Sequence, residues 1–87
     1  MLPYNVKVHL DTNILIIIGK AIKEKRITNG YTQTRLAEIA HVHRNFISCV
    51  EKGTRSATIT TLNQLLEGLG TNIFAFMSEL ASQIKSK

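Results

Sequence analysis

The sequence predicts an all-α domain of five helices preceded by one short β-strand. Apolar residues recur at helical spacing along most of the chain, cap and turn residues separate the helical segments, and one N-terminal segment alternates in polarity instead. The chain has 87 residues, of which 44% are hydrophobic and one is proline. This is the size of one small domain and not the composition of a disordered chain, so residues 1–87 are expected to form a single domain.

The N-terminal segment carries the strand pattern. Val6, Val8 and Leu10 would share one face, with polar residues between them, which predicts a strand at residues 6–10 within an extension of residues 1–11. A single strand leaves its hydrogen-bonding groups unpaired. It would therefore pair with the same strand of a second copy or with a partner protein, or else remain a frayed tail.

The first helix is expected to begin at residues 11–13, where Asp, Thr or Asn can cap it, and to end at residues 26–27, before Asn29-Gly30. Its apolar face has isoleucines one turn apart, at Ile14, Ile18 and Ile22.

Two short helices with a tight turn between them follow. Thr32 can cap the second helix, "QTRLAEIA", and the third is expected to run from His43 or Arg44 to the residue before Gly53. Only about three residues, "HVH", separate the two helices, which is the layout of a helix-turn-helix.

Two more helices complete the predicted domain. The fourth is expected to start at Thr58 or Thr60 and to end near Gly68 and Gly70, and the fifth to span about residues 72–85. The fifth has two apolar flanks, formed by Ile73, Met77, Leu80 and Ile84 and by Phe74, Phe76 and Ala81. One flank would stay exposed in a single chain, so residues 72–85 are expected to form the dimerisation helix.

All of the excess positive charge lies in the middle of the chain. Residues 20–55 hold eight lysines and arginines and three acids, which accounts for the whole net charge of +5. A basic region of this kind favours a polyanionic partner, most often nucleic acid, although a solvated basic face is the alternative.

Other classes of function have little support. Cys49 is the single cysteine, which excludes a disulfide within the chain and, with no signal-peptide pattern, favours a cytoplasmic protein. The apolar run at residues 14–18 is too short to cross a membrane. His43 and Cys49 lie on roughly opposite sides of a helix and nothing nearby completes a metal site. No catalytic constellation is present, so we expect neither an enzyme nor a metal or cofactor.

Residues 19–70 resemble the Cro/repressor-type (Xre-type) helix-turn-helix family. The resemblance is carried by "KEKRITNGYTQ", "LAEIA-V-RNFIS-VEKG" and "TLNQLLEGLG", while "RNFIS-VEKGTRSATITTL" is most similar to the controller proteins of restriction–modification systems. It implies a lambda-repressor-like fold with the third helix in the major groove of double-stranded DNA. The chain departs from the family at His41, where glycine is usual because the turn needs a positive φ.

The resemblance places base-reading residues at the start of the third helix. Arg44 can donate two hydrogen bonds to guanine, and Asn45 can pair with adenine or, alternatively, touch phosphate or cap the helix. Ser48 is short and would at most make a van der Waals contact. His43 could cap the helix, touch phosphate, or make binding sensitive to pH.

A second group is expected at the DNA backbone. Gln33 lies at a helix N-terminus, where the dipole favours an anion, and in the resembled family a glutamine here binds phosphate. Phe46 either closes over the core or lies against the sugar–phosphate backbone. The other candidates, each of which could instead belong to a solvated charged face, are Arg35, Lys52, Thr54 and Arg55.

The resemblance also implies a partly buried ion pair between Arg26 and Glu51, which would fix the third helix on the scaffold. The expected dimer interface consists of Phe74, Phe76, Met77 and Leu80, unless these residues simply complete the core. A two-fold dimer would place two recognition helices about one DNA turn apart.

These observations predict a sequence-specific, dimeric DNA-binding transcriptional regulator of a palindromic operator, with autoregulation implied by the resemblance. The alternative is the antitoxin of a toxin–antitoxin pair, which would use the same domain and mask a toxin with its strand or last helix. A neighbouring gene for a methyltransferase and nuclease, or for a toxin, would separate the two. A pure protein-interaction module is disfavoured by Gln33, Arg44 and the confined charge.

Overall fold

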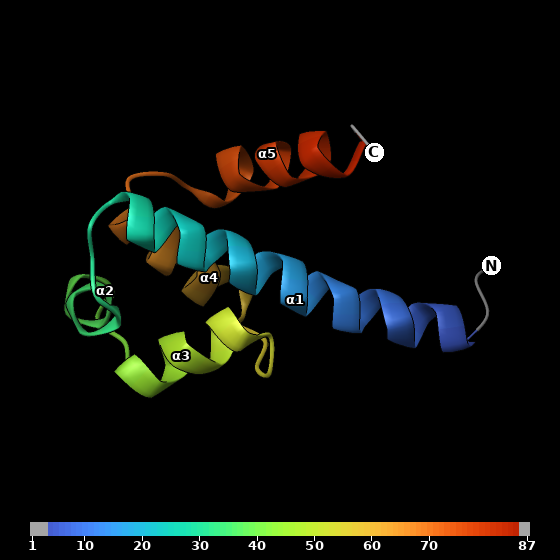
Figure 1. The fold of residues 1–87 in the computed structure, drawn as a ribbon, viewed down its shortest axis with the longest axis horizontal. Coiled ribbons are helices and arrows are strands. Elements are labelled where there is room, and N and C mark those ends of the chain that lie inside the picture. Colours follow the sequence, from blue (N-terminus) through green and yellow to red (C-terminus); the bar gives the residue numbers. More distant parts are fainter. Residues whose placement is uncertain (1–3, 86–87) are drawn as a thin grey trace.

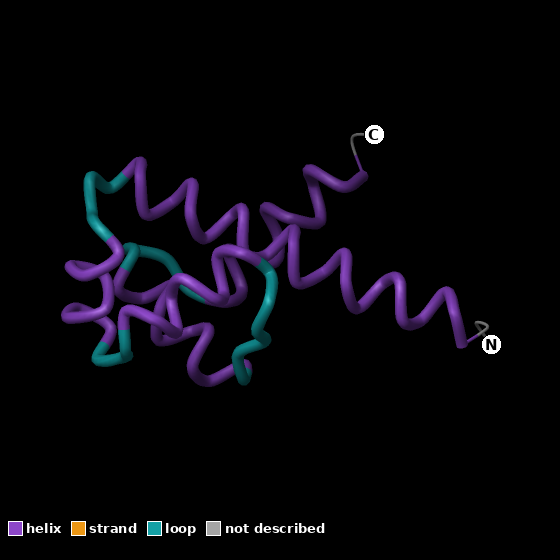
Figure 2. Tube along the Cα trace, turned by 60° about the horizontal axis from the view of Figure 1, so that its bottom comes forward, coloured by secondary structure: helices purple, strands orange, loops and turns teal. Residues whose placement is uncertain are grey.

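A computed structural model describes the backbone of residues 4–85 and the side chains of residues 14–83. The described residues form five helices and no strand (Figures 1 and 2). The helices are α1 (Tyr4–Thr28), α2 (Gln33–Ala40), α3 (Arg44–Lys52), α4 (Ile59–Gly68) and α5 (Ile73–Lys85). α1 crosses the whole molecule, and the other helices gather around its C-terminal half (Figure 1).

The predicted N-terminal strand is wrong. Residues 6–10 lie inside α1, which begins at Tyr4 rather than at residues 11–13. The alternation covered only five residues, and Val6 and Leu10 are also spaced by four, so the same letters fit a helix. A helix satisfies its own backbone groups, whereas a lone strand does not. The expected pairing of this strand with a second copy or a partner therefore falls with it.

One face of each helix contributes to a single apolar core. Its buried members are Ile22, Leu36, Ala37, Ala40, Ile47, Leu62, Leu65, Leu66, Leu69, Phe76 and Leu80. Among the side chains that the structure describes, Phe76 is the largest that is fully buried. The isoleucine row of α1 enters this core toward its C-terminal end: Ile22 is buried and Ile18 packs against the core, whereas Ile14 is 49% exposed.

The predicted caps of the second and fourth helices and the left-handed turn at His41 are confirmed, whereas the cap expected at residues 11–13 is wrong because these residues lie inside α1. Thr32 Oγ1 accepts a hydrogen bond from the Arg35 N–H at 3.0 Å, and Thr58 Oγ1 accepts one from the Thr61 N–H at 3.1 Å. His41 ends α2 in the left-handed region, with φ 58° and ψ 46°. Histidine therefore occupies a conformation in which glycine is the least strained residue, and the α2–α3 turn keeps its geometry.

A glycine inside α1 allows α3 to approach closely. A Cβ atom added to Gly19 would lie 2.3 Å from the Val50 carbonyl oxygen and 2.8 Å from that of Glu51. Such distances are far below van der Waals contact, so no other residue fits here without moving α3. Glycine lowers the stability of a helix by about 1 kcal/mol relative to alanine, but its missing side chain lets the backbones of α1 and α3 pack directly against each other here.

An ion pair two turns further along α1 holds the same helix. The Arg26 guanidinium donates from Nε to Glu51 Oε2 at 2.7 Å and from Nη2 to Oε1 at 3.1 Å. Its Nη1 donates to the Tyr31 carbonyl oxygen at 2.8 Å. The Glu51 side chain is 2% exposed and that of Arg26 is 11% exposed. The hydrogen bond to Glu51, together with charge attraction and against the effect of burial, raises the pKa of Arg26, which therefore stays charged.

We expect Gly19→Ala to destabilise the protein, although the same change stabilises an ordinary helix interior. Overpacking costs about 1–3 kcal/mol and exceeds the gain in helix propensity of about 1 kcal/mol or less. Urea unfolding measures the free energy of unfolding, with Lys20→Ala on the exposed side of α1 as the control. A stabilised Gly19→Ala variant would show that α3 does not depend on this contact.

We expect Arg26→Met to cost about 3–5 kcal/mol, because it leaves the Glu51 carboxylate buried without its charge partner. The double variant Arg26→Met/Glu51→Leu should lose less, since no buried charge remains. The matched control is Arg35→Ala, which breaks the exposed Arg35–Glu38 pair of 3.2 Å and should cost about 1 kcal/mol or less. Equal losses from the Arg26 single and double variants in urea unfolding would contradict the predicted coupling.

Candidate nucleic-acid interface

The outer face of α3 presents the predicted base-reading residues. Arg44 and Asn45 are exposed in its first turn, while Ile47, Val50 and Glu51 are buried on the opposite face. Ser48, one turn after Arg44, is half-buried on the same outer side. Arg44 has no partner among the described residues, so all five of its N–H donors are available to a ligand.

His43 occupies the cap position of α3 without acting as a cap. Its backbone is extended, with φ −75° and ψ 143°, but its side chain makes no capping hydrogen bond. The imidazole is exposed beside Arg44. Of the three roles that the sequence left open, side-chain capping is therefore absent from the structure.

Gln33 is tied to the buried ion pair. It is the first residue of α2, and its Nε2 donates to Glu51 Oε1 at 3.0 Å. An amide nitrogen carries two protons, so one remains for a second acceptor. The contact orients the Gln33 amide at the N-terminus of α2, where helix N–H groups favour an anion.

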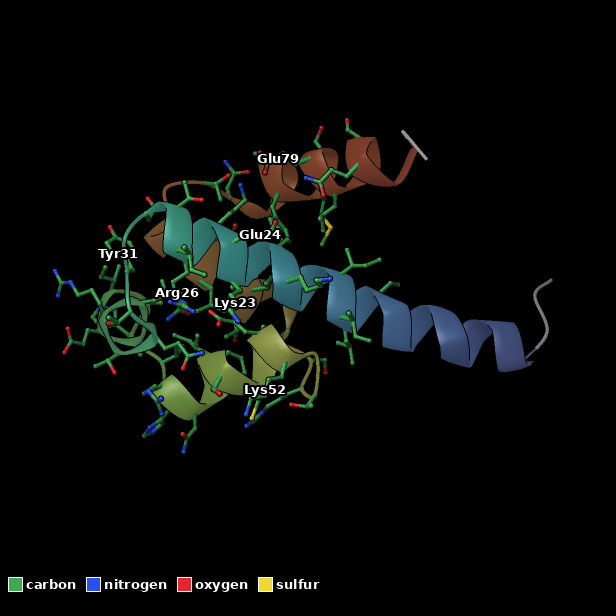
Figure 3. The ribbon with its side chains drawn as sticks, in the orientation of Figure 1. Lys23, Glu24, Arg26, Tyr31, Lys52 and Glu79 are labelled. Atoms are coloured by element: carbon green, nitrogen blue, oxygen red, sulfur yellow. The ribbon has the colours of Figure 1, made fainter. Side chains whose placement is uncertain are left out.

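The other residues expected to contact the DNA backbone differ in their interactions within the protein. Lys52 is exposed on the side of α3 that faces away from α1 (Figure 3). Thr54 is exposed, but its hydroxyl donates to the Cys49 carbonyl oxygen at 3.1 Å and so helps to end α3. Arg35 forms its exposed ion pair with Glu38.

Phe46 and Arg55 lie against each other. Phe46 is half-buried and packs against the core, and the Arg55 guanidinium carbon stands 5.2 Å from the centroid of its ring. They border an open hollow of about 430 Å³, whose other lining residues are Val42, His43, Asn45 and Thr61. The core contact expected of Phe46 is therefore present, and a contact of Phe46 with the DNA backbone stays a prediction.

The four candidate interface residues of α5 divide into two pairs. Phe76 and Leu80 are buried in the core of a single chain, whereas Phe74 is 83% exposed and Met77 lies at the surface. Met77 borders an apolar groove of about 340 Å³ between α1 and α5, which is also lined by Ile14, Ile17, Ile18, Leu80 and Ala81.

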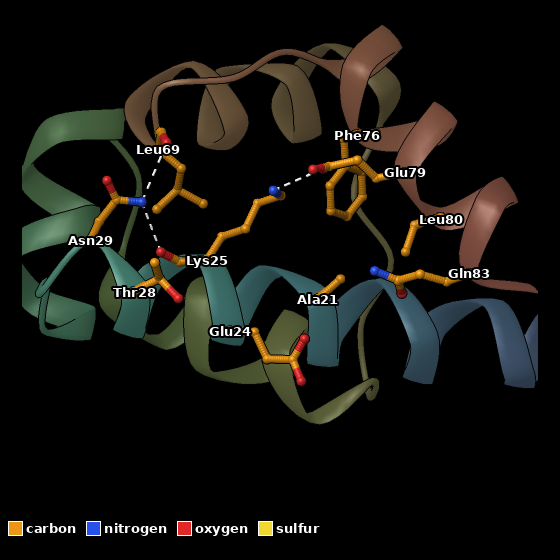
Figure 4. Close-up of a pocket in the computed structure, with 10 residues that line it drawn as sticks. All are labelled: Ala21, Glu24, Lys25, Thr28, Asn29, Leu69, Phe76, Glu79, Leu80 and Gln83. Atoms are coloured by element: carbon orange, nitrogen blue, oxygen red, sulfur yellow. Dashed lines mark hydrogen bonds and ion pairs between the residues drawn. The ribbon is translucent and has the colours of Figure 1, made fainter.

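A second pocket between α1 and α5 is lined by both polar and apolar residues. Figure 4 shows Lys25 reaching across it to Glu79, with Nζ and Oε1 2.8 Å apart, and Asn29 bonded to the carbonyl oxygens of Lys25 and Leu69. Its volume is about 280 Å³, and none of the DNA-contact candidates lines it. These polar contacts attach α5 and the end of α4 to α1.

The described residues contain no group of three or more histidine, cysteine or acidic side chains placed to hold a metal ion. None of the helices in this part of the chain is long and apolar enough to span a membrane.

Three features of the site were missed from the sequence. Gly19 gave a signal, because a glycine in the middle of a helix often marks close packing. The Gln33–Glu51 hydrogen bond and the Arg55–Phe46 contact gave none, because each joins residues whose proximity depends on the packed helices.

Known proteins with similar sequences contain the same domain. The family model described as helix-turn-helix matches residues 22–76. The control protein C.SmaI of Serratia marcescens is 35% identical over 57 residues, which are 66% of this chain and 68% of that protein. The control protein C.BamHI of Bacillus amyloliquefaciens is 27% identical over 62 residues, covering 70% and 76%.

Solved structures agree with the sequence comparison. The restriction–modification controller protein C.Esp1396I, solved as a tetramer in complex with its natural 35 base-pair operator, superposes with a TM-score of 0.74 at 31% identity. The superposition covers 80% of this chain and 92% of that one. The chain therefore belongs to the Cro/repressor-type helix-turn-helix family, within which it is similar to the controller proteins of restriction–modification systems.

Proposed function

We propose that the protein is a sequence-specific transcriptional regulator that binds a palindromic operator as a homodimer, with α3 in the major groove. One observation carries the proposal: Arg44 and Asn45 project freely from the first turn of a helix whose other face is held on α1. The operator complex of C.Esp1396I, a protein of similar fold, supports it. By the same similarity to controller proteins, the operator would include that of the protein's own gene.

The proposed contacts divide into base readout and backbone binding. Arg44 would bind guanine O6 and N7, and Asn45 would bind adenine N6 and N7. Gln33, already oriented by Glu51, would give its second amide proton to a phosphate oxygen, and the N-terminus of α2 would add a favourable dipole. Arg35 and Lys52 would contact phosphates on either side of the groove.

The proposed dimer uses the exposed part of α5. Phe74 and Met77 remain accessible, and Met77 continues into the apolar groove between α1 and α5. A groove lined by isoleucines and a methionine is favourably covered by an apolar surface of a second copy. Phe76 and Leu80 would support this surface from below, because they fill the core of their own chain.

We expect Arg44→Ala and Arg35→Ala to weaken DNA binding in different ways. Selection from a random pool of duplexes supplies the operator. Arg44→Ala should then cost about 1–3 kcal/mol and relax specificity at one base pair, because one bidentate contact is lost. Arg35→Ala should weaken binding to all sequences alike and lower the slope of log K against log salt by about one. If Arg44→Ala also weakened binding to all sequences alike and lowered the salt slope by about one, Arg44 would contact a phosphate and not a base.

We expect Phe74→Asp to weaken the dimer at least about tenfold, since it places a carboxylate in an apolar contact. The control is Ile59→Asp, because Ile59 is also an exposed apolar residue in the first turn of a helix, where an acid is tolerated. Sedimentation equilibrium across a concentration series measures both dissociation constants. A dimer that both variants leave unchanged would show that α5 is not the interface.

A further inference from the structure

The contact between Arg55 and Phe46 joins the loop after α3 to the first turn of α3. The guanidinium carbon of Arg55 stands over the ring at 5.2 Å from its centroid. Among the described residues Arg55 has no hydrogen bond or ion pair, so the ring is its one specific partner. Arg26 and Arg35, in contrast, are bound to carboxylates. Arg55 is thus positioned by an aromatic face while all its N–H donors stay available.

The surroundings of this pair suit a nucleic-acid backbone. The hollow beside it is lined by Val42, His43, Asn45 and Thr61 as well as by the pair itself, and none of these residues is acidic. Asn45 belongs to the exposed first turn of α3, so Arg55 borders the same hollow as a proposed base-reading residue. A guanidinium held over an aromatic face keeps its N–H groups available, and these groups match the oxygens of a phosphate.

We propose that Phe46 is a positioning residue. Its ring holds the Arg55 side chain beside the first turn of α3, so that Arg55 is already ordered when it binds a DNA phosphate. The inference rests on the proposed function. Phe46 acts through Arg55 and does not itself touch DNA, because its ring packs on the core and carries the guanidinium. A free arginine side chain loses conformational freedom when it binds, and an arginine that is already ordered loses less.

The contact can be tested first without DNA. Side-chain protons of Arg55 that lie over the ring should show upfield-shifted NMR signals from the ring current. Phe46→Tyr should keep these shifts, and Phe46→Leu, which retains apolar bulk without an aromatic face, should abolish them. Arg55 signals at ordinary positions in the wild-type protein would overturn the inference, whatever the protein does with DNA.

A double-variant cycle then tests the effect on binding to the duplex selected from the random pool. Phe46→Leu should weaken binding about two- to fivefold, the range of an exposed cation–π contact. Phe46→Tyr should remain within about twofold of the wild type. In the Arg55→Ala background, Phe46→Leu should cause no further loss. Arg55→Ala should lower the salt slope by about one, whereas Phe46→Leu should leave the slope unchanged.

The opposing results are distinct. If Phe46→Leu weakens binding equally with and without Arg55, Phe46 acts independently of Arg55 and the inference is wrong. Urea unfolding of each variant detects a loss of fold, which would lower affinity in both backgrounds. If the wild-type protein binds no duplex from the pool while the Arg55 signals remain shifted, the proposed function fails, and the DNA role of Phe46 fails with it.

Discussion

The Glu51 carboxylate is almost fully buried, and it accepts hydrogen bonds from Arg26 at both oxygens and from Gln33 at Oε1. The position of α3 depends on this group, because it joins residues of α1, α2 and α3 in one network. Buried ion pairs contribute little net stability compared with apolar contacts of the same size. Their hydrogen bonds are directional, however, and direction is what a helix that reads DNA requires. Gly19 complements the network by letting the backbones of α1 and α3 touch.

The same network couples the scaffold to the proposed DNA contacts. Gln33 is oriented by Glu51 and still has one amide proton for a phosphate. Arg44 stands on the opposite face of the helix that Glu51 anchors, so a rotation of α3 would move it relative to a base edge. Arg55 is placed differently, by an aromatic ring in place of a carboxylate. A carboxylate would compete with phosphate for the guanidinium, and an aromatic face does not.

In helix α5 the sequence pattern identifies the apolar flanks but not which flank is buried. Phe74 and Phe76 are two residues apart and therefore lie on nearly opposite faces of the helix. The sequence identified two apolar flanks but assigned both phenylalanines to the dimer interface. The structure buries Phe76 and exposes Phe74, because only one flank faces the core formed by α1 and α4. In α1, likewise, Ile14 and Ile22 share a row of the helix, but Ile22 is fully buried in the core, whereas Ile14 borders the open groove beside α5 and is 49% exposed.

By itself the sequence determined the boundaries of the four C-terminal helices and the region of excess charge. The helix boundaries depend on interactions within a few residues, such as a threonine that caps a helix or a glycine that ends one. The resemblance added the left-handed turn at His41 and the Arg26–Glu51 pair. The tertiary structure alone decided the contact at Gly19, the support of Arg55 by Phe46 and the exposure of Phe74, because each depends on how closely, and at which face, two distant segments meet. The strand predicted at residues 6–10 was wrong because the local pattern itself was ambiguous: five alternating residues are too few to distinguish a strand from the first turns of α1.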